Sequence, residues 1–458
     1  MIITITDYGA TPGKKMSTLN IQKAIDDCYI AGGGTVIVPS GDFVTGGILL
    51  RSRVSLHLKA NAHLIASRNV NDYNSFLNDS INPIKTSDKT DDLFLPFGKR
   101  KSYDFLNKCA SRWNNALIRA IDSENISITG EEGSFIDGMD CYDPLGEEDF
   151  RGPHAINFSR CKNITLSGYT IQNSANWAHS LLMCENISVK NIIVKAGHDG
   201  IHLTSCANIK IAECEFYTGD DCIAGIDNLN MTVINCKINT ACNGFRLSGE
   251  NILIDHCNIF GPGKFCHRSS LSNNEKQNGK STEQNHRFNM LSAFTYYADF
   301  SRNFSCSPGN IVMQNCKITN VERFLCYNFD NDKWQTNVPL KDITFKNIQA
   351  SNIKLPLCAV GSKKIPIVLK LQNTDISFAK DRSVILWWDN NKIYETNEFI
   401  KTANFEKIVL DNVKVKGIHG GILIKSWSIN GEVIINKLDC DDFNGTLRQN
   451  TNEEFFNV

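Results

Sequence analysis

Short apolar runs with polar breaks between them recur along most of the chain. Residues 35–38, 47–50 and 54–58 are each rich in Val, Ile, Leu or Thr, and Gly, Ser, Asn or Asp separates such runs. Runs of this length and composition predict β-strands. We therefore expect a mainly β protein.

One segment near the start has helical periodicity instead. Four apolar residues fall at positions i, i+3, i+4 and i+7 after Ser17, and the three glycines at 32–34 end the pattern. This spacing predicts one short amphipathic helix that caps the N-terminal end of the β structure. The four residues are Ile21, Ala24, Ile25 and Cys28.

An internal repeat follows. Cysteines with an asparagine two positions later recur at intervals of 23 and 22 residues, and a second column of cysteines continues the period. About 22 residues is one coil of a parallel β-helix, with neighbouring rungs ~4.8 Å apart. The sequence predicts an all-β, right-handed parallel β-helix, a solenoid of ~22-residue coils that forms a single domain over residues 1–458. The columns are Cys161, Cys184, Cys206 with Asn163, Asn186, Asn208, and then Cys214, Cys236, Cys257.

These columns have two interpretations. Stacked cysteines could bind a metal, but the close Cys-x-x-Cys pairs of a zinc site are absent from the sequence. We expect small core residues at the cysteine positions. The asparagines are typical of tight corners, because Asn tolerates the left-handed backbone conformation.

The period breaks between Cys257 and Gly309. A polar stretch at 269–285 precedes an aromatic cluster that includes Tyr296 and Tyr297. We expect a long insertion loop at 261–308 that flanks a groove, although a flexible insertion without a function has the same pattern.

Charge and hydropathy narrow the possible partners. Lys and Arg number 48 against 49 for Asp and Glu, so the chain has no basic excess for a nucleic-acid backbone. No apolar run reaches the ~18 to 20 residues of a membrane span, so we expect a soluble protein without a membrane partner. The start at Met1 has no signal-peptide pattern, so the compartment is cytoplasmic as given, or periplasmic or secreted if a signal peptide was removed. The oligomeric state is not predicted.

The same 22-residue period places acidic residues in a column. Trp177, Asp199, Asp221 and Asn243 are each 22 residues apart, and Asp220 supplies a third carboxylate beside Asp221. Crowded carboxylates split their pKa values, so one can act as an acid while another stays a base. Turn residues and a calcium site are the alternatives for these aspartates.

Alternation along the following strands assigns side chains to faces. Ile201, Leu203, Phe245 and Leu247 fit inward positions, so His202 and Arg246 should point outward on the face of the aspartates. That face is the predicted groove. Arg246 is expected to overlook it and grip a carboxylate or a diol, with a solvated surface arginine as the alternative.

The motifs at 173–177, 197–201, 219–224 and 243–245 resemble, in this order, those of the polygalacturonase family, glycoside hydrolase family 28. The likeness runs from residue 5 to about residue 260. It implies an inverting hydrolysis without a metal or other cofactor. Asp220 is then the acid, and Asp199 with Asp221 holds the attacking water.

Two departures from the family pattern concern the substrate. Asn243 stands where the family has a histidine, and no Arg-x-Lys pair, which holds a galacturonate carboxylate in the family, occurs near residues 323–327. The insertion at 261–308 should close one side of the groove, which favours short or branched substrates, so we expect an exo-acting enzyme, or one specific for decorated pectic saccharides. The candidate substrate-binding residues are Trp177, His179, His202, Asn243, Arg246, Tyr296 and Tyr297.

Two other functions fit the same sequence. A polysaccharide lyase on this fold would need calcium and a Lys or Arg base. A non-catalytic glycan-binding β-helix would not need three crowded carboxylates. In each case the expected partner is a carbohydrate.

Overall fold

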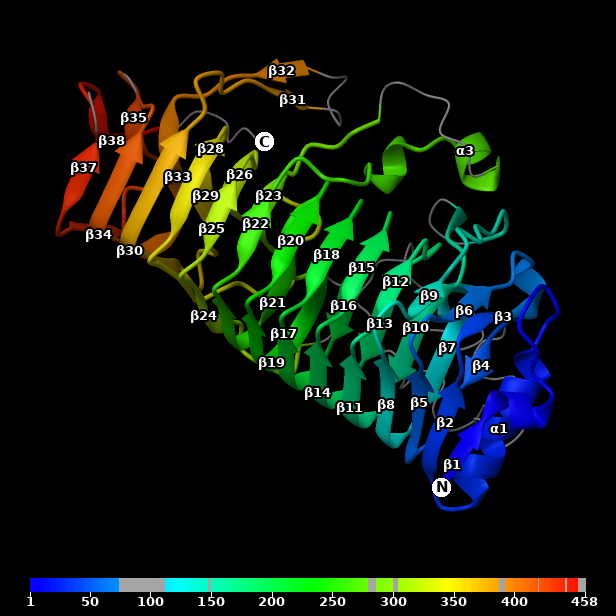
Figure 1. Cartoon of the computed structure of the whole chain (residues 1–458). Helices are drawn as coiled ribbons and strands as arrows, with labels where there is room; N and C mark the ends of the chain where they lie inside the picture. The colour runs from blue at the N-terminus through cyan, green and yellow to red at the C-terminus, as the bar shows by residue number, and fades with distance from the viewer. Residues whose placement is uncertain are drawn as a thin grey trace.

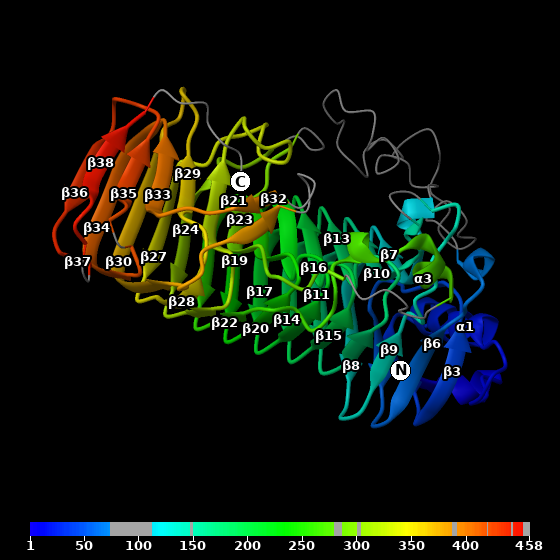
Figure 2. The ribbon, with the colours of Figure 1, turned by 90° about the horizontal axis from the view of Figure 1, so that it is seen from above.

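The chain winds into a parallel β-helix (Figures 1 and 2). The computed structural model describes residues 1–73, 112–146, 150–278, 286–299, 304–386, 392–418, 420–440 and 443–451. Each strand of a coil pairs in parallel with the equivalent strand of the next coil, as in the register Leu181↔Leu203. A buried apolar cluster extends from Ile3 to Ile424 inside the coils. No helix in the described part is long and apolar enough to cross a membrane.

The strands form three stacks that run along the helix. The first stack carries the face that the sequence predicts as a groove. It consists of β4 (Ile48–Leu49), β7 (Ala116–Ile121), β10 (His154–Ser159), β13 (His179–Leu182), β16 (Ile201–Thr204), β19 (Ile223–Ile234), β21 (Asn243–Asp255), β23 (Ser292–Tyr296), β26 (Arg323–Asn328), β29 (Leu357–Val360), β33 (Glu398–Ala403), β35 (Ile422–Ser426) and β38 (Thr446–Asn450).

The second stack follows the asparagine corner of each coil. The long strands β19 and β21 bend from the first stack into it. Its other strands are β1 (Ile2–Thr4), β2 (Gly34–Val38), β5 (Val54–Leu58), β8 (Glu124–Gly130), β11 (Lys162–Ser167), β14 (Glu185–Lys190), β17 (Ala207–Ala212), β24 (Gly309–Gln314), β27 (Asp342–Lys346), β30 (Ile367–Phe378), β34 (Phe405–Lys416) and β36 (Glu432–Ile435).

The third stack closes each coil, and β30 and β34 reach it from the second stack. An antiparallel hairpin of β31 (Val384–Leu386) and β32 (Lys392–Tyr394) lies outside the three stacks. The remaining strands of the third stack are β3 (Gly41–Thr45), β6 (Ala62–Ala66), β9 (Phe135–Asp137), β12 (Thr170–Gln172), β15 (Ile193–Ala196), β18 (Glu215–Thr218), β20 (Lys237–Thr240), β22 (Asn258–Phe260), β25 (Lys317–Thr319), β28 (Gln349–Ile353) and β37 (Leu438–Cys440).

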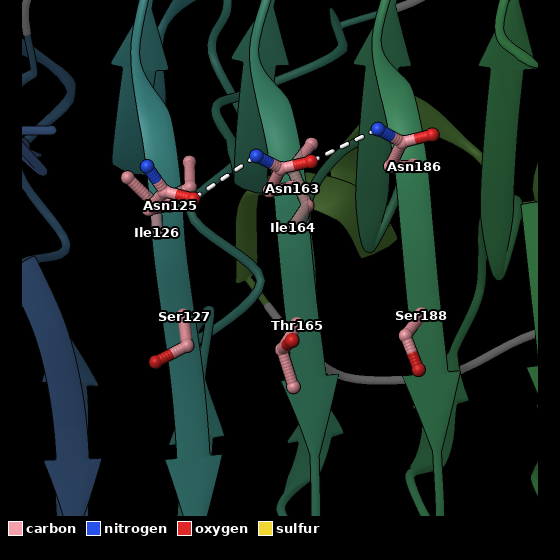
Figure 3. A pocket seen from close by; sticks show the side chains of 8 residues that line it. All are labelled: Asn125, Ile126, Ser127, Asn163, Ile164, Thr165, Asn186 and Ser188. Atoms are coloured by element: carbon pink, nitrogen blue, oxygen red, sulfur yellow. Dashed lines mark hydrogen bonds between the residues drawn. The ribbon is translucent and has the colours of Figure 1, made fainter. Parts of the chain in front are cut away.

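The asparagine column is a structural ladder, as predicted. Asn125, Asn163 and Asn186 have φ values of 56°, 55° and 57°, in the left-handed region. The Asn163 side-chain amide donates to Asn125 Oδ1 at 3.0 Å, and Asn186 donates to Asn163 Oδ1 at 2.9 Å (Figure 3). The ladder continues through Asn208 to Asn310. These bonds fix the register of successive coils at one corner.

The cysteine columns are core residues, as predicted. Cys161, Cys184 and Cys206 are buried free thiols. The Cys184 and Cys206 thiols donate to backbone carbonyls of their own and the preceding coil at 3.4–3.7 Å. The small thiol thus fills the space inside the corner and donates a hydrogen bond to a buried backbone carbonyl.

Helix α1 (Thr18–Ile30) covers the N-terminal end of the coils (Figure 1). The four residues of the predicted apolar face are all fully buried in it. The helix covers the open edge of the first coils, where unpaired strands would otherwise meet solvent.

The segment at 261–308 is only partly the loop that the sequence predicts. It contains η6 (Arg268–Ser270) and α3 (Asn273–Asn278), but then re-enters the first stack as β23, which pairs with β21 and β26. Residues 279–285 and 300–303 lie outside the described part. Both views place α3 beside the N-terminal half of the stack (Figures 1 and 2). The segment between β22 and β23, the excursion, therefore reaches back along the first stack.

Candidate active site

Three aspartates from two adjacent coils meet at the edge of the first stack. Asp199 lies between β15 and β16, and Asp220 with Asp221 lies between β18 and β19. The Gly200 amide donates to the Asp221 carbonyl at 2.9 Å, which holds the two turns one above the other. One carboxylate oxygen from each aspartate lies within 4.8 Å of the other two. All three residues are buried.

Asp220 is bound by cations from two irregular segments. Arg268 of the excursion donates from Nε to Asp220 Oδ2 at 2.8 Å, and the Arg151 Nη2 lies 3.9 Å from the same oxygen. The His267 Nε2 lies 3.7 Å from Asp220 Oδ1. Burial alone would raise the pKa of Asp220, but His267, Arg268 and Arg151 hold it well below its ordinary value. This environment favours the ionised form of Asp220.

Asp199 has a different environment. One hydrogen bond of 2.8 Å joins its Oδ2 to the His202 Nδ1. Burial, and then the charge of Asp220, raise the pKa of Asp199 to about 8. Below that pH the neutral form of Asp199 is favoured, although the family pattern assigns this residue as a base.

Asp221 is held by the next coil. The Asn243 side-chain amide donates to Asp221 Oδ1 at 2.7 Å, and the Arg246 Nη1 donates to Oδ2 at 3.4 Å. Burial and the charge of Asp220 raise the pKa of Asp221 to about 6, against the opposing charge of Arg246. Asn243 thus orients the Asp221 carboxylate. The Asn243 side chain is held in turn by β23, because its Oδ1 accepts hydrogen bonds from the Ser292 and Thr295 hydroxyls.

Aromatic rings frame the carboxylates. The Trp177 ring stacks on the His202 ring with centroids 3.7 Å apart, and Trp113 meets Trp177 edge to face. The Arg246 guanidinium lies 3.8 Å from the Tyr297 ring centroid and 4.9 Å from that of Trp334. The Arg246 side chain, which the sequence predicts to overlook the groove, lies at the cluster and is 17% exposed under these rings.

For two residues the prediction of substrate binding is wrong, because their side chains are buried in the core. His179 is fully buried, and its ring nitrogens bond to the Tyr169 hydroxyl at 3.1 Å and the Gly200 carbonyl at 3.0 Å. Tyr296 is also fully buried in the core, and its hydroxyl donates to the Val338 carbonyl at 2.6 Å. Neither side chain can contact a sugar in this conformation. The other predicted residues, Trp177, His202, Asn243, Arg246 and Tyr297, lie at the cluster.

Sequence reasoning missed the cations around Asp220. Arg151 follows β9 in an irregular segment and has its guanidinium 5.2 Å from the Trp113 ring centroid, with His198 Nδ1 accepting from it at 3.3 Å. His267 and Arg268 lie in the excursion. Neither segment follows the 22-residue period, so the period gave no signal for them. The only indication of these cations in the sequence was the break in the period after Cys257, where the excursion begins.

The cluster has the spacing of metal ligands in two combinations. The three aspartates form one, and Asp220, Cys242 and His267 form another, again with ligand atoms within 4.8 Å. Guanidinium groups, however, already contact Asp220 and Asp221. The His267 Nδ1 accepts from the Ser269 amide, which leaves the proton on the nitrogen that faces Asp220. We therefore assign no metal ligand.

A hollow lies away from the aspartate cluster, on another face of the molecule. Asn125, Asn163 and Asn186 line it together with hydroxyl side chains of β8, β11 and β14 (Figure 3). These strands belong to the second stack, and the hollow contains none of the candidate residues. It is the outer surface of the asparagine ladder.

Comparisons with known proteins find similar sequences. Residues 104–248 match the family model described as Glycosyl hydrolases family 28. A Vitis vinifera protein named "Probable polygalacturonase" is 27% identical over 237 residues, which cover 48% of this chain and 43% of that protein. The exo-poly-alpha-D-galacturonosidase of Dickeya chrysanthemi is 26% identical over 254 residues, with 48% and 41% covered. The match therefore spans less than half the length of these relatives.

Solved structures share the fold. The family 28 exopolygalacturonase of Yersinia enterocolitica has a TM-score of 0.51 and 15% identity, over 100% of this chain and 79% of that chain. The prediction of an all-β, right-handed parallel β-helix is confirmed.

Proposed function

We propose that the chain is a divergent member of glycosyl hydrolase family 28 and hydrolyses a glycosidic bond in a pectic saccharide, as the family match and the polygalacturonase relatives support. One observation carries the proposal. Three carboxylates from adjacent coils converge within 4.8 Å, beside aromatic rings of the kind on which sugars stack. A turn or a structural ion pair would not require a third buried carboxylate at the same place.

The proposed roles follow the family pattern. Asp220 donates a proton to the leaving oxygen, and Asp199 with Asp221 holds the attacking water. The anomeric configuration is then inverted. Inverting enzymes in general separate acid and base by ~6.5–9.5 Å, which is longer than the spacing here, so the inversion rests on the family pattern and not on this distance.

The substrate proposed is an acidic sugar chain cut from one end. Three arginines, Arg151, Arg246 and Arg268, surround the aspartates, and guanidinium groups bind carboxylates through paired donors. Each of these side chains is less than a fifth exposed, so the site offers little open length for an internal segment of polymer. Both features support a short or terminal uronate substrate.

The test is release of reducing ends from a panel of pectic fractions, with the products separated by size. We expect monosaccharide or short products from galacturonan oligomers, and the loss of this release in Asp220→Asn. Rapid internal cleavage of polygalacturonan would contradict the exo assignment. Absence of any released sugar, with saccharide binding retained, would instead support the alternative of a glycan-binding protein.

That alternative has one observation in its favour. Arg268 forms an ion pair with the residue that the family uses as the acid, and an ionised acid cannot donate a proton. The proposed hydrolysis therefore requires this pair to change when the substrate binds.

A further inference from the structure

The ion pair between Arg268 and Asp220 conflicts with the role of Asp220 as an acid. The Nε–Oδ2 distance of 2.8 Å is that of a charge-assisted hydrogen bond, which favours the ionised carboxylate. Asp199, by contrast, has no guanidinium within the ion-pair distances found among the described residues, and it pairs with His202. A catalytic cycle that begins from this arrangement needs a step that returns a proton to Asp220.

The charges that face Asp220 come from four parts of the chain. Asp199 and His198 precede β16, Asp221 is its neighbour, Arg151 approaches from the segment after β9, and His267 with Arg268 approaches from the excursion. The Cys242 thiol and, more remotely, Arg246 complete the surroundings. Two of these neighbours are carboxyl groups. Once the Arg268 contact is lost, burial and these carboxyl groups raise the pKa of Asp220 against His267 and Arg151, which remain beside it.

Arg268 is the cation in the better position to change partner. Its side chain is 13% exposed, while that of Arg151 is 4% exposed and lies against the Trp113 and Trp177 rings. Arg268 begins the short helix η6, whose preceding residue His267 accepts from the Ser269 amide. The backbone is therefore held while the guanidinium points from the rim of the site toward Asp220.

We propose that Arg268 exchanges its ion-pair partner when substrate binds: a uronate carboxylate takes the guanidinium from Asp220, and Asp220 takes up one proton from solvent. This inference rests on the proposed hydrolase function and names the event that makes the site competent. The proton then passes from Asp220 to the glycosidic oxygen as its bond to the anomeric carbon breaks. A water oxygen forms the new bond to that carbon, and the proton released by the water goes to the Asp199–Asp221 pair.

The exchange also explains how the site could select its substrate. A neutral sugar has no carboxylate with which to compete for Arg268, so Asp220 stays ionised and the bond is not cleaved. Selection for the uronate then acts on the catalytic step in addition to binding.

Calorimetry of digalacturonate binding at pH 6 tests the exchange without requiring turnover. Heats measured in buffers of different ionisation enthalpy give the number of protons taken up. We expect wild type to take up about one proton per bound ligand, and Asp220→Asn to take up none. Arg268→Ala should take up much less than wild type, because its Asp220 has already lost the guanidinium. Lys264→Ala, in the same excursion but stacked on Tyr217 with its Nζ 3.7 Å from the ring centroid, is the matched control and should behave as wild type.

Hydrolysis provides the second readout. Arg268→Ala should lose most of the preference for a free uronate over its methyl ester, expressed as the ratio of the two kcat/KM values. Proton uptake that is absent in wild type, or that persists in Asp220→Asn, overturns the exchange, as does a failure of wild type to bind the uronate. Uptake that follows the expected pattern without any product release would keep the exchange and refute the hydrolase function.

Discussion

Arg246→Ala tests how the site keeps Asp221 ionised. The Arg246 Nη1 lies 3.4 Å from Asp221 Oδ2, and the Asp221 side chain is 2% exposed. Opposite charges at this distance attract by about 4 to 5 kcal/mol at an effective dielectric constant of about 20. Since one pKa unit corresponds to about 1.4 kcal/mol, the attraction is equivalent to about three units before water fills the vacated space. We expect the pKa of Asp221, about 6 in the intact site, to rise by at least about one unit.

This rise should appear in both activity and stability. If Asp221 helps to hold the attacking water, the acid limb of the pH profile of kcat/KM moves upward, and the rate below pH 6 falls at least about tenfold. A carboxyl group whose pKa is higher in the folded protein than in the unfolded chain destabilises the fold as pH rises between the two values. That interval ends near pH 6 in wild type and extends further in the variant. The difference between the two thermal midpoints should therefore widen from pH 5 to pH 8.

Initial rates on galacturonan oligomers and thermal unfolding, both measured from pH 4 to pH 9, supply the two readouts. Arg51→Ala is the matched control, because Arg51 is also a buried arginine that pairs with a carboxylate, Asp26, at 2.9 Å, but in the N-terminal cap. It should lower the thermal midpoint without moving the acid limb. If Arg246→Ala stays folded with the acid limb and the pH dependence of wild type, Arg246 does not control Asp221.

Three further outcomes are expected. Asp199→Asn, Asp220→Asn and Asp221→Asn should each lower turnover by at least ~100-fold with an unchanged circular dichroism spectrum; near-normal turnover of folded Asp220→Asn would exclude it as the acid. Proton NMR in the first minutes of hydrolysis should show the inverted anomer, and chelator should leave the rate unchanged; a retained anomer or an inactive chelated enzyme would contradict the scheme. Asn186→Ala should lower the free energy of unfolding by ~1–3 kcal/mol, because it removes two ladder hydrogen bonds and strains a backbone at φ 57°. Asn186→Gly removes the same bonds without the strain and should cost less, so equal thermal midpoints for the two variants would argue against backbone strain.

The regular part of the fold could be predicted because stacking repeats the same constraint in every coil. Asn163 and Asn186 each occupy a left-handed corner, and Cys184 and Cys206 each fill the space behind it, so the period is visible in the sequence. The same period brought Asp199 and Asp221 into one column.

The two residues that are wrongly predicted to bind substrate, His179 and Tyr296, lie beside strand positions that point into the core. His179 pairs with Ile201, and Tyr296 pairs with Leu247, and the alternation predicts an inward position for both partners. The sequence therefore held the signal that these side chains are core residues. For Tyr296 the register could be read only after β23 was recognised as a strand of the stack.

The cations around Asp220 could not be predicted by the same reasoning. Arg151 and Arg268 belong to irregular segments whose path depends on tertiary contacts, and no periodic pattern relates them to the aspartates. A charge on such a segment can approach any of several coils. These cations lower the pKa of Asp220 below that of Asp199, the opposite of what the family pattern implies. This order could be inferred only from the distances between the cations and Asp220 in the structure.

The length of the coil that carries the excursion has a thermodynamic consequence of its own. Cys184 and Cys206 are consecutive in their ladder and 22 residues apart, whereas Cys257 and Cys316, also consecutive, are 59 residues apart and still joined by a 3.3 Å contact from amide to thiol. The entropy of loop closure grows only with the logarithm of length, so the longer connection costs about 0.9 kcal/mol more. This is comparable to the net contribution of one hydrogen bond. A solenoid can therefore accommodate a segment such as the one that carries His267 and Arg268 at little cost to its stability, while the strands of the other coils keep their register.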